Sequence, residues 1–173
     1  MTSLGELVRA RRTTKVFGTE PVDRATIAEL LELARWAPNH HLTDPWRFRV
    51  LGPAARERLK AAAEQAKPGS AGKLDRAPTL IVASAKQTGD AAQDREDVLA
   101  AGVAAYIVLL AAHARGLAGY WRTLAVLDEP AGRAAVGLPA DEIPVGLLHL
   151  GDPRQEQRVP PKAPVDEIAV FLD

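Results

Sequence analysis

Residues 99–121, LAAGVAAYIVLLAAHARGLAGYW, form the most apolar stretch of the chain, and they decide how the rest can fold. A membrane-spanning helix needs about 20 predominantly apolar residues, and this stretch is long enough to qualify. Its apolar part is rich in alanine, however, and His113, Arg115 and Gly116 then end it. A helix that is apolar on all sides is also what the centre of a layered domain requires. We therefore predict a helix buried in a globular core and ended by Gly116, and no membrane span.

The segments around this helix alternate between strand and helix patterns. Residues 46–51, 79–85 and 144–151 have the β-branched or alternating apolar pattern of strands, and residues 119–123 predict a further short strand. Helices are expected from capping signals at Ser3 and Asp23, from Pro53, and over residues 131–136, while the polar run 86–97 leads into the long helix. Strands interleaved with helices predict an α+β or α/β layered domain. At 173 residues, the chain has room for one domain, 1–173.

Composition narrows the functional classes. The 22 basic and 22 acidic residues cancel, which disfavours a polyanion-binding surface and therefore nucleic acid. The chain has no cysteine, so it can form neither a disulfide framework nor a thiolate nucleophile. The N-terminus lacks the apolar core of a signal peptide, and a cytoplasmic protein is expected.

The tail is the one segment that cannot build a core of its own. Residues 153–164 are rich in proline and charge, yet the patterned apolar stretch VDEIAVFL, residues 165–172, follows them. We expect that stretch to dock on another surface, and an arm across a partner subunit is one solution.

The loop WAPNHHLTDPW, residues 36–46, raises the question of a metal or acid/base site because it contains His40, His41 and Asp44. Neighbouring residues usually point in different directions, and a metal ion needs three or four converging ligands, so we predict no metal here. His113 and His149 are isolated on apolar elements and are interpreted as satisfied structural histidines. Residues 67–74, KPGSAGKL, lack the spacing of a phosphate loop, and no G-x-G-x-x-G occurs.

The stretch RRTTKVF, residues 11–17, points to a ligand. Arg11, Arg12 and Lys15 place three cations within five residues, and guanidinium groups match phosphate oxygens well. A phosphate monoester is the natural partner. The alternative is that these cations only complement the dipole at the end of the first helix.

RRTTKVF also resembles the RRS-x-R-x-F opening of the nitroreductase family, whose members use FMN. The resemblance continues through WAPNHHLTDPWRFRVL, GLAGYWRT, LLHLGDP and PPKAPVDEI, in that order along the chain. It implies an α+β fold of three layers, with a central mixed or antiparallel sheet flanked by helices. It also implies a homodimer that exchanges a C-terminal arm and has two FMN sites at the subunit interface.

The resemblance assigns cofactor contacts by position. One subunit would hold the phosphate and the polar edge of the flavin, and the partner's loop would line the ring. The residues implied are Arg11, Arg12, Thr13, Lys15 and Lys162 for the phosphate side, Trp36, Pro38, Asn39 and His40 for the loop, and Trp121, Arg122 and Thr123 near the ring. Lys15 stands where the family has arginine, and Thr13 and Thr123 replace serines, keeping the charge and the hydroxyls.

The activity implied is electron transfer from NADH or NADPH to nitroaromatic, quinone or similar acceptors by a ping-pong mechanism, with the chemistry carried by the flavin. No residue is assigned as a general acid, although His40 is a weak candidate for proton donation. Two alternatives stay open. The chain could dehalogenate aromatics or fragment flavin, as some relatives of the family do, or it could be a non-catalytic dimer that binds FMN or phosphate.

Overall fold

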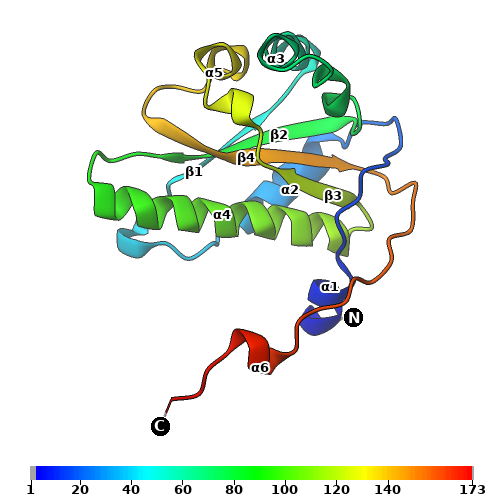
Figure 1. Ribbon diagram of the computed structural model, residues 1–173, viewed down its shortest axis with the longest axis vertical. Helices are drawn as coiled ribbons and strands as arrows, with labels where there is room; N and C mark the ends of the chain where they lie inside the picture. The colour runs from blue at the N-terminus through cyan, green and yellow to red at the C-terminus, as the bar shows by residue number, and fades with distance from the viewer. Residues whose placement is uncertain (1–2, 173) are drawn as a thin grey trace.

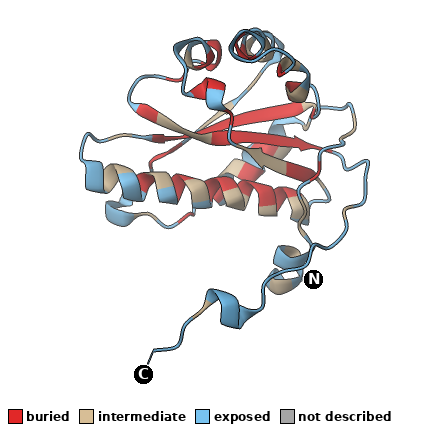
Figure 2. Ribbon diagram, in the orientation of Figure 1, coloured by how far each residue is buried: buried red, intermediate tan, exposed pale blue. Residues whose placement is uncertain are grey.

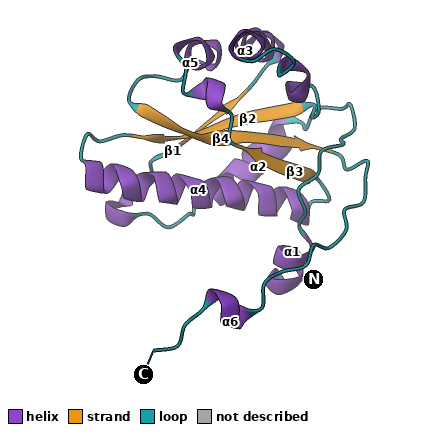
Figure 3. Cartoon of the chain, viewed as in Figure 1, coloured by secondary structure: helices purple, strands orange, loops and turns teal. Residues whose placement is uncertain are grey.

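A computed structural model describes residues 3–172 of the chain. It contains one four-stranded sheet in which neighbouring strands are all antiparallel, in the order β1-β2-β4-β3. Figure 3 shows the strands at the centre and the helices around them. The strands are β1 (Trp46–Val50), β2 (Thr79–Lys86), β3 (Ala118–Arg122) and β4 (Glu142–Gly151). The α-helices are α1 (Leu4–Ala10), α2 (Arg24–Ala34), α3 (Pro53–Ala66), α4 (Ala91–Ala114), α5 (Pro130–Val136) and α6 (Val165–Ile168).

The sheet is the middle of three layers. Helices α3 and α5 cover one face, and α4 and α2 cover the other, as Figure 1 shows. Each face has its own apolar core: α4 and α2 pack on Ile81 and Leu148, while α3 and α5 pack on Val82 and Leu147. The buried residues follow the two faces of the sheet in Figure 2. The prediction of an α+β fold with a sheet flanked by helices is confirmed.

All four predicted strands are present, within two or three residues of their expected bounds. β2 runs along the middle of the sheet, and seven of its eight residues are buried. Alternating apolar and basic residues in β1 suit an edge strand, because only one of its faces meets the core. Local pattern therefore located the strands well.

Helix α4 is longer than the sequence indicated. It begins at Ala91, where the Asp90 side chain accepts hydrogen bonds from the amides of Ala92 and Gln93, so part of the polar run 86–97 is helical. It ends as predicted, with Gly116 in the left-handed region at φ 78°.

By length and composition α4 would qualify as a membrane span. However, half of its most apolar window is buried inside the fold, against the sheet and α2. The predicted packing of this helix in a layered core is what the structure shows.

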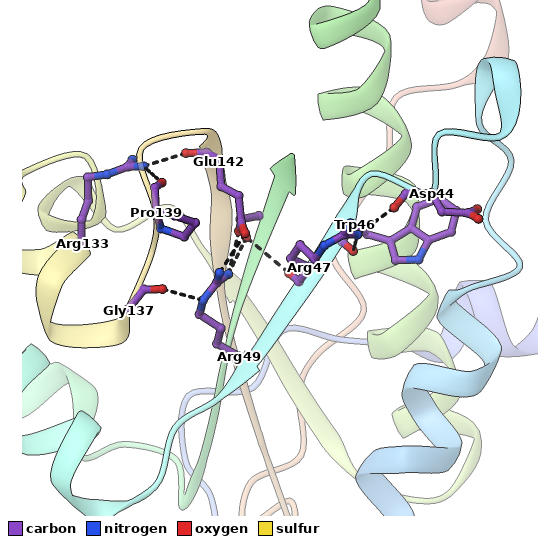
Figure 4. A network of polar contacts seen from close by, with 9 residues as sticks. Asp44, Trp46, Arg47, Arg49, Arg133, Gly137, Pro139 and Glu142 are labelled. Atoms are coloured by element: carbon purple, nitrogen blue, oxygen red, sulfur yellow. Dashed lines mark hydrogen bonds and ion pairs between the residues drawn. The ribbon is translucent and has the colours of Figure 1, made fainter. Parts of the chain in front are cut away.

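A polar network ties the edge strand β1 to β4. The Arg49 guanidinium donates two hydrogen bonds to the Glu142 carboxylate, at 2.7 and 2.8 Å, and one to the carbonyl of Gly137 (Figure 4). Ser84 on β2 donates to the same carboxylate. Burial alone would raise the pKa of Glu142, but the hydrogen bonds from Arg49 and Ser84 outweigh it and hold the pKa below its usual value. This network stabilises the sheet at the end away from the termini.

The C-terminal arm leaves the domain. After β4 the chain runs past α1, and α6 lies apart from the sheet layers (Figure 1). The side chains of Ile168, Val170, Phe171 and Leu172 are 74–89% exposed. Among residues 3–172, the apolar stretch predicted to dock therefore finds no surface that buries it.

Candidate functional site

A large cavity assembles residues from both ends of the chain. It has a volume of about 720 Å³, and it lies between the end of α1, the middle of α4 and the arm. It is lined by Val8, Arg9, Arg11, Arg12, Thr13, Tyr106, Gln157, Arg158, Val159, Pro160 and Lys162. Four residues assigned to the phosphate side, Arg11, Arg12, Thr13 and Lys162, thus meet in one cavity although they are about 150 positions apart at the extremes.

The two predicted arginines are held differently. Arg11 lies with its guanidinium 5.8 Å from the centre of the Tyr106 ring, and its Nε is buried with no hydrogen-bond partner among the described residues. Arg12 turns back along α1 and donates from Nη1 to the carbonyls of Arg9 and Arg11. The carbonyls at the end of a helix lack partners within the helix, so Arg12 caps α1. The interaction with the helix end that the alternative expected is thus present for Arg12.

A smaller cavity of about 330 Å³ lies on the other side of the same segment and includes Arg11, Arg12 and His113. Burial, followed by the charges of Arg11 and Arg12, lowers the pKa of His113. His113 is therefore neutral at physiological pH and adds no cation to the group.

The loop 38–44 forms a second candidate region. Pro38, Asn39 and His40 line a shallow cavity of about 380 Å³ against α4, where Leu99 and Val103 are exposed. The Asn39 side chain accepts a hydrogen bond from the Asp44 amide at 3.0 Å and so closes the loop on itself. These three residues face a different cavity from the arginines.

The loop has a strained backbone and a specific anchor on α4. His41, Leu42 and Asp44 have positive φ values of 56°, 51° and 44°, which residues other than glycine seldom adopt. His40 Nδ1 lies 2.7 Å from a carboxylate oxygen of Glu96, and Thr43 donates to the buried Asp97 at 2.6 Å. Two acidic side chains of α4 thus hold the loop in this conformation.

The two histidine rings are stacked, with their centroids 3.8 Å apart. The expectation that they point in different directions is therefore wrong. Among residues 3–172 no three His, Asp or Glu side chains are close enough together to bind a metal ion.

The end of β3 carries the third predicted group. Trp121 lies over Gly146 and donates from Nε1 to the carbonyl of Val145 at 3.2 Å. Arg122 is half-buried, and its Nη1 has no partner among the described residues. Thr123 is exposed.

Five predicted contacts line none of the cavities described above: Lys15, Trp36 and the three residues at the end of β3, Trp121, Arg122 and Thr123. Lys15 is exposed, past the segment that enters the large cavity, and Trp36 is 74% exposed at the end of α2. Within one chain, the predicted residues therefore fall into separate groups: the α1 and arm cavity, the loop 38–44, and the end of β3.

The sequence did not single out several residues that the fold brings to these places. Arg9, Tyr106 and Arg158 line the large cavity, and Glu96 holds His40. The spacing of these residues in the sequence does not reveal that they lie together, because the cavity is formed by tertiary contacts between α1, α4 and the arm. Helical periodicity could have placed Arg9 and Arg12 on one side of a longer α1, since residues three apart are neighbours on a helix.

His149 also differs from its interpretation in the sequence. It is fully buried on β4 beside Tyr120, with ring centroids 5.2 Å apart, and neither ring nitrogen has a partner among the described residues. The interpretation as a satisfied histidine is wrong in this respect. Burial, with smaller contributions from Arg122, Arg56 and Arg76, lowers the pKa of His149 to about 4.

The large cavity fits a phosphorylated ligand. Its lining contains five cations and no carboxylate, and the buried Nε of Arg11 lacks a hydrogen-bond acceptor. A phosphate monoester supplies acceptor oxygens and close to two negative charges. The apolar side chains of Val8, Tyr106, Val159 and Pro160 leave room for an organic group beside it.

Comparisons with known proteins identify the family of this chain. The family model described as "Nitroreductase family" matches residues 8–152. YdjA of Escherichia coli (strain K12), whose name provisionally assigns it to the NAD(P)H nitroreductases, is 32% identical over 165 residues, covering 89% of this chain and 90% of YdjA. The 5,6-dimethylbenzimidazole synthase of Rhodospirillum rubrum is 29% identical, covering 91% of this chain and 85% of that protein.

Two solved structures are similar over almost the whole chain. A nitroreductase-like family protein from Bacillus cereus superposes with a TM-score of 0.90 at 26% identity, covering 100% of this chain and 97% of the other. A protein from Exiguobacterium sibiricum 255-15, solved in complex with FMN, has a TM-score of 0.85 at 17% identity and covers 99% of this chain and 98% of the other. The sequence resemblance is thereby confirmed: the chain belongs to the nitroreductase family.

Proposed function

We propose that the protein is an FMN-dependent oxidoreductase that transfers electrons from NADH or NADPH to a small organic acceptor, such as a nitroaromatic or a quinone, with ping-pong kinetics. The observation that carries this proposal is the cavity in which Arg11, Arg12 and Lys162 meet without a carboxylate. FMN bound in the E. sibiricum relative and the NAD(P)H nitroreductase name of YdjA support it.

In this proposal Arg11, Arg12, Thr13 and Lys162 bind the phosphate of FMN. Arg11 donates from the Nε that has no partner among the described residues, and Lys162 places a charge on the phosphate from the arm. To bind the phosphate, the Arg12 guanidinium must leave the carbonyls at the end of α1 and rotate toward the ligand. Lys15 follows on the non-helical segment after α1, and a contact with the polar edge of the ring is proposed for it.

The loop 38–44 is proposed to line the flavin ring bound mainly by the partner subunit. Pro38, Asn39 and His40 line a different cavity from their own chain's arginines, which supports a role for them at a site on another chain. The exposed apolar side chains of α1, α4 and the arm support a homodimer. They are Leu4, Val8, Leu99, Val103, Val165, Ile168, Val170, Phe171 and Leu172. Their burial between two copies would remove apolar surface from water and place each loop beside its partner's site.

When bound, FMN would supply a flavin that accepts two electrons from the donor and transfers them to the acceptor. The protein's own contribution is to position and shield it. Arg122, with an unpartnered Nη1 at the end of β3, is proposed to face the ring and favour negative charge there. His40, held at Nδ1 by Glu96, would present its other nitrogen to a ligand.

A second candidate is flavin fragmentation, which the similarity to 5,6-dimethylbenzimidazole synthase favours. Incubating the reduced protein with oxygen and analysing the products by mass spectrometry separates the two: intact FMN after many turnovers supports the oxidoreductase, and a benzimidazole product supports the alternative.

The phosphate role is tested by titrating the apoprotein with FMN and, separately, with riboflavin, which lacks the phosphate. We expect the wild type to bind FMN at least tenfold more tightly than riboflavin, since charge-assisted hydrogen bonds contribute about 1.5–3 kcal/mol each. An Arg11→Gln variant should lose most of that preference and keep its affinity for riboflavin. Equal loss for both ligands would contradict phosphate recognition by Arg11.

A further inference from the structure

The charge of the large cavity is unusual for this chain. The whole sequence is balanced, with 22 basic and 22 acidic residues. The cavity is lined by Arg9, Arg11, Arg12, Arg158 and Lys162 and by no acidic side chain. Like charges at short range repel, and in a partly desolvated cavity that repulsion is stronger than in water. The cavity is therefore suited to hold several negative charges.

None of these five cations is neutralised by a carboxylate of the described chain. Elsewhere five basic residues pair with carboxylates, among them Arg49 with Glu142, Lys60 with Asp75, and Arg115 with Glu29. No such ion pair involves a cavity cation in residues 3–172. The charge thus awaits a ligand from outside the chain.

One phosphate monoester does not neutralise the positive charge of this cavity. It carries at most about two negative charges at neutral pH. Arg11, Arg12 and Lys162, which the proposed function assigns to the FMN phosphate, already exceed that charge. Arg9 and Arg158 remain, with about two further positive charges and part of a volume of about 720 Å³.

The remaining pair lies at the rim. Arg9 is in the last turn of α1, and Arg158 is on the arm that passes it; both side chains are exposed, whereas Arg11 and Arg12 are half-buried. The half-buried Arg11 and Arg12 are suited to hold a resident cofactor; Lys162, which the proposed function adds to them, is exposed like Arg9 and Arg158. Exposed cations at the entrance suit an anion that arrives from solvent and leaves again in each cycle.

We propose that Arg9 and Arg158 form a second anion subsite, which binds a phosphate group of the nicotinamide dinucleotide that donates the electrons. This inference rests on the proposed function, because it presupposes that FMN occupies Arg11, Arg12 and Lys162. The phosphate has two sources: the 2′-phosphate, which only NADPH has, and the pyrophosphate, which NADPH and NADH share. A guanidinium fork matches either group.

The test uses the FMN-loaded protein and three variants, Arg9→Gln, Arg158→Gln and, as a matched control, Arg154→Gln. Arg154 is also an exposed arginine of the arm, but it does not line the cavity. Dissociation constants of NADPH and of NADH are measured by anaerobic stopped-flow reduction. As a readout independent of turnover, the non-reducing ligand NADP⁺ is titrated by calorimetry at two salt concentrations.

We expect Arg9→Gln and Arg158→Gln each to weaken NADP⁺ binding by about five- to tenfold, to reduce its salt dependence, and to leave FMN occupancy unchanged. Arg154→Gln should match the wild type. Loss confined to NADPH and NADP⁺ assigns the subsite to the 2′-phosphate, and equal loss for NADH assigns it to the pyrophosphate.

Unchanged affinities for both dinucleotides in both variants would overturn the subsite. So would a loss of FMN itself in these variants, because the rim cations would then belong to the cofactor. A wild-type protein that takes up no FMN would instead overturn the proposed function, so the two failures can be told apart.

Discussion

At the residue scale, His149 shows how much a single buried group can set the response to pH. Its ring is fully buried and has no partner among the described residues, and burial lowers its pKa to about 4. In the unfolded chain the pKa of histidine is near 6.5. As the pH falls from 6.5 to about 4, the unfolded state therefore takes up a proton that the folded state refuses. The folded protein loses stability over that window, by about 3 kcal/mol at most.

This predicts that a His149→Phe variant, which keeps a ring beside Tyr120, has a flatter dependence of the free energy of unfolding on pH between 6.5 and 4. Urea denaturation at several pH values measures it. A second variant, His149→Leu, guards against poor packing of the larger ring. If both variants show the wild-type slope, His149 is not the group that titrates.

Glu142 acts in a lower window, so the two effects are separable. Its pKa lies below the usual value near 4.5, since the hydrogen bonds from Arg49 and Ser84 outweigh the effect of burial. The stability it contributes is complete above the unfolded pKa and is lost only as the pH falls through its lower folded value.

Gly146 leaves room for the Trp121 ring because it has no side chain. A Cβ there would lie 2.2 Å from Nε1 and 2.7 Å from Cδ1 of Trp121, whereas a Cβ at Gly102 would lie 3.6 Å from the far edge of the same ring. We expect Gly146→Ala to displace Trp121, break its hydrogen bond to Val145, and cost about 1–3 kcal/mol. Gly102→Ala is the matched control and should be nearly neutral.

The change is followed by tryptophan fluorescence together with urea denaturation. A Gly146→Ala protein with wild-type stability and an unchanged spectrum would show that the ring has room to move, contrary to this account.

At the element scale, the Arg49–Glu142 pair holds the edge strand β1 to β4. Breaking a buried pair from one side leaves a desolvated charge without a partner. Arg49→Met should therefore destabilise the protein by about 3 kcal/mol, and the double variant Arg49→Met with Glu142→Gln should recover part of this loss. Chemical denaturation of the three variants gives the coupling. If the double variant is no more stable than Arg49→Met, the unpaired Glu142 carboxylate does not destabilise the folded protein, contrary to this expectation.

Sequence pattern predicted the elements better than their junctions. The strands and the end of α4 at Gly116 follow from alternation and from glycine, which are local signals. The start of α4 was missed, because its first turns are polar and exposed and carry no apolar period. The stacking of His40 on His41 depends on a strained backbone that the local sequence does not predict.

The candidate site was predictable only in part for the same reason. RRTTK and Lys162 could be named from motifs, and Arg11, Arg12, Thr13 and Lys162 do meet in one cavity. Arg9, Arg158 and Glu96 become relevant only through tertiary contacts between α1, α4 and the arm, which leave no periodic trace in the sequence.

At the scale of the whole molecule, the exposed apolar surface of α1, α4 and the arm is the feature that one chain cannot explain. Leu99 and Val103 are 66% and 41% exposed on a helix whose other side is fully buried. If this surface joins two copies, Val103→Glu should convert a dimer to a monomer and lower FMN occupancy together with it, because each site would lose its partner's loop.

The control for that prediction is Ala61→Glu, an exposed position of α3 on the opposite layer, which should remain dimeric. Light scattering after size-exclusion chromatography gives the mass, and the visible spectrum gives the FMN content. A Val103→Glu protein that stays dimeric, or a wild type that is monomeric and fully loaded, would contradict an interface on α4.

The most direct test of FMN-dependent electron transfer is to mix the purified, FMN-reconstituted protein anaerobically with NADPH or NADH and to record the visible flavin absorption in a stopped-flow instrument. We expect one FMN per chain, rapid bleaching by at least one donor at a rate far above that of free FMN, and return of the colour when a quinone or nitroaromatic is added. A protein that binds no FMN, or whose bound FMN is reduced no faster than free FMN, would contradict this expectation.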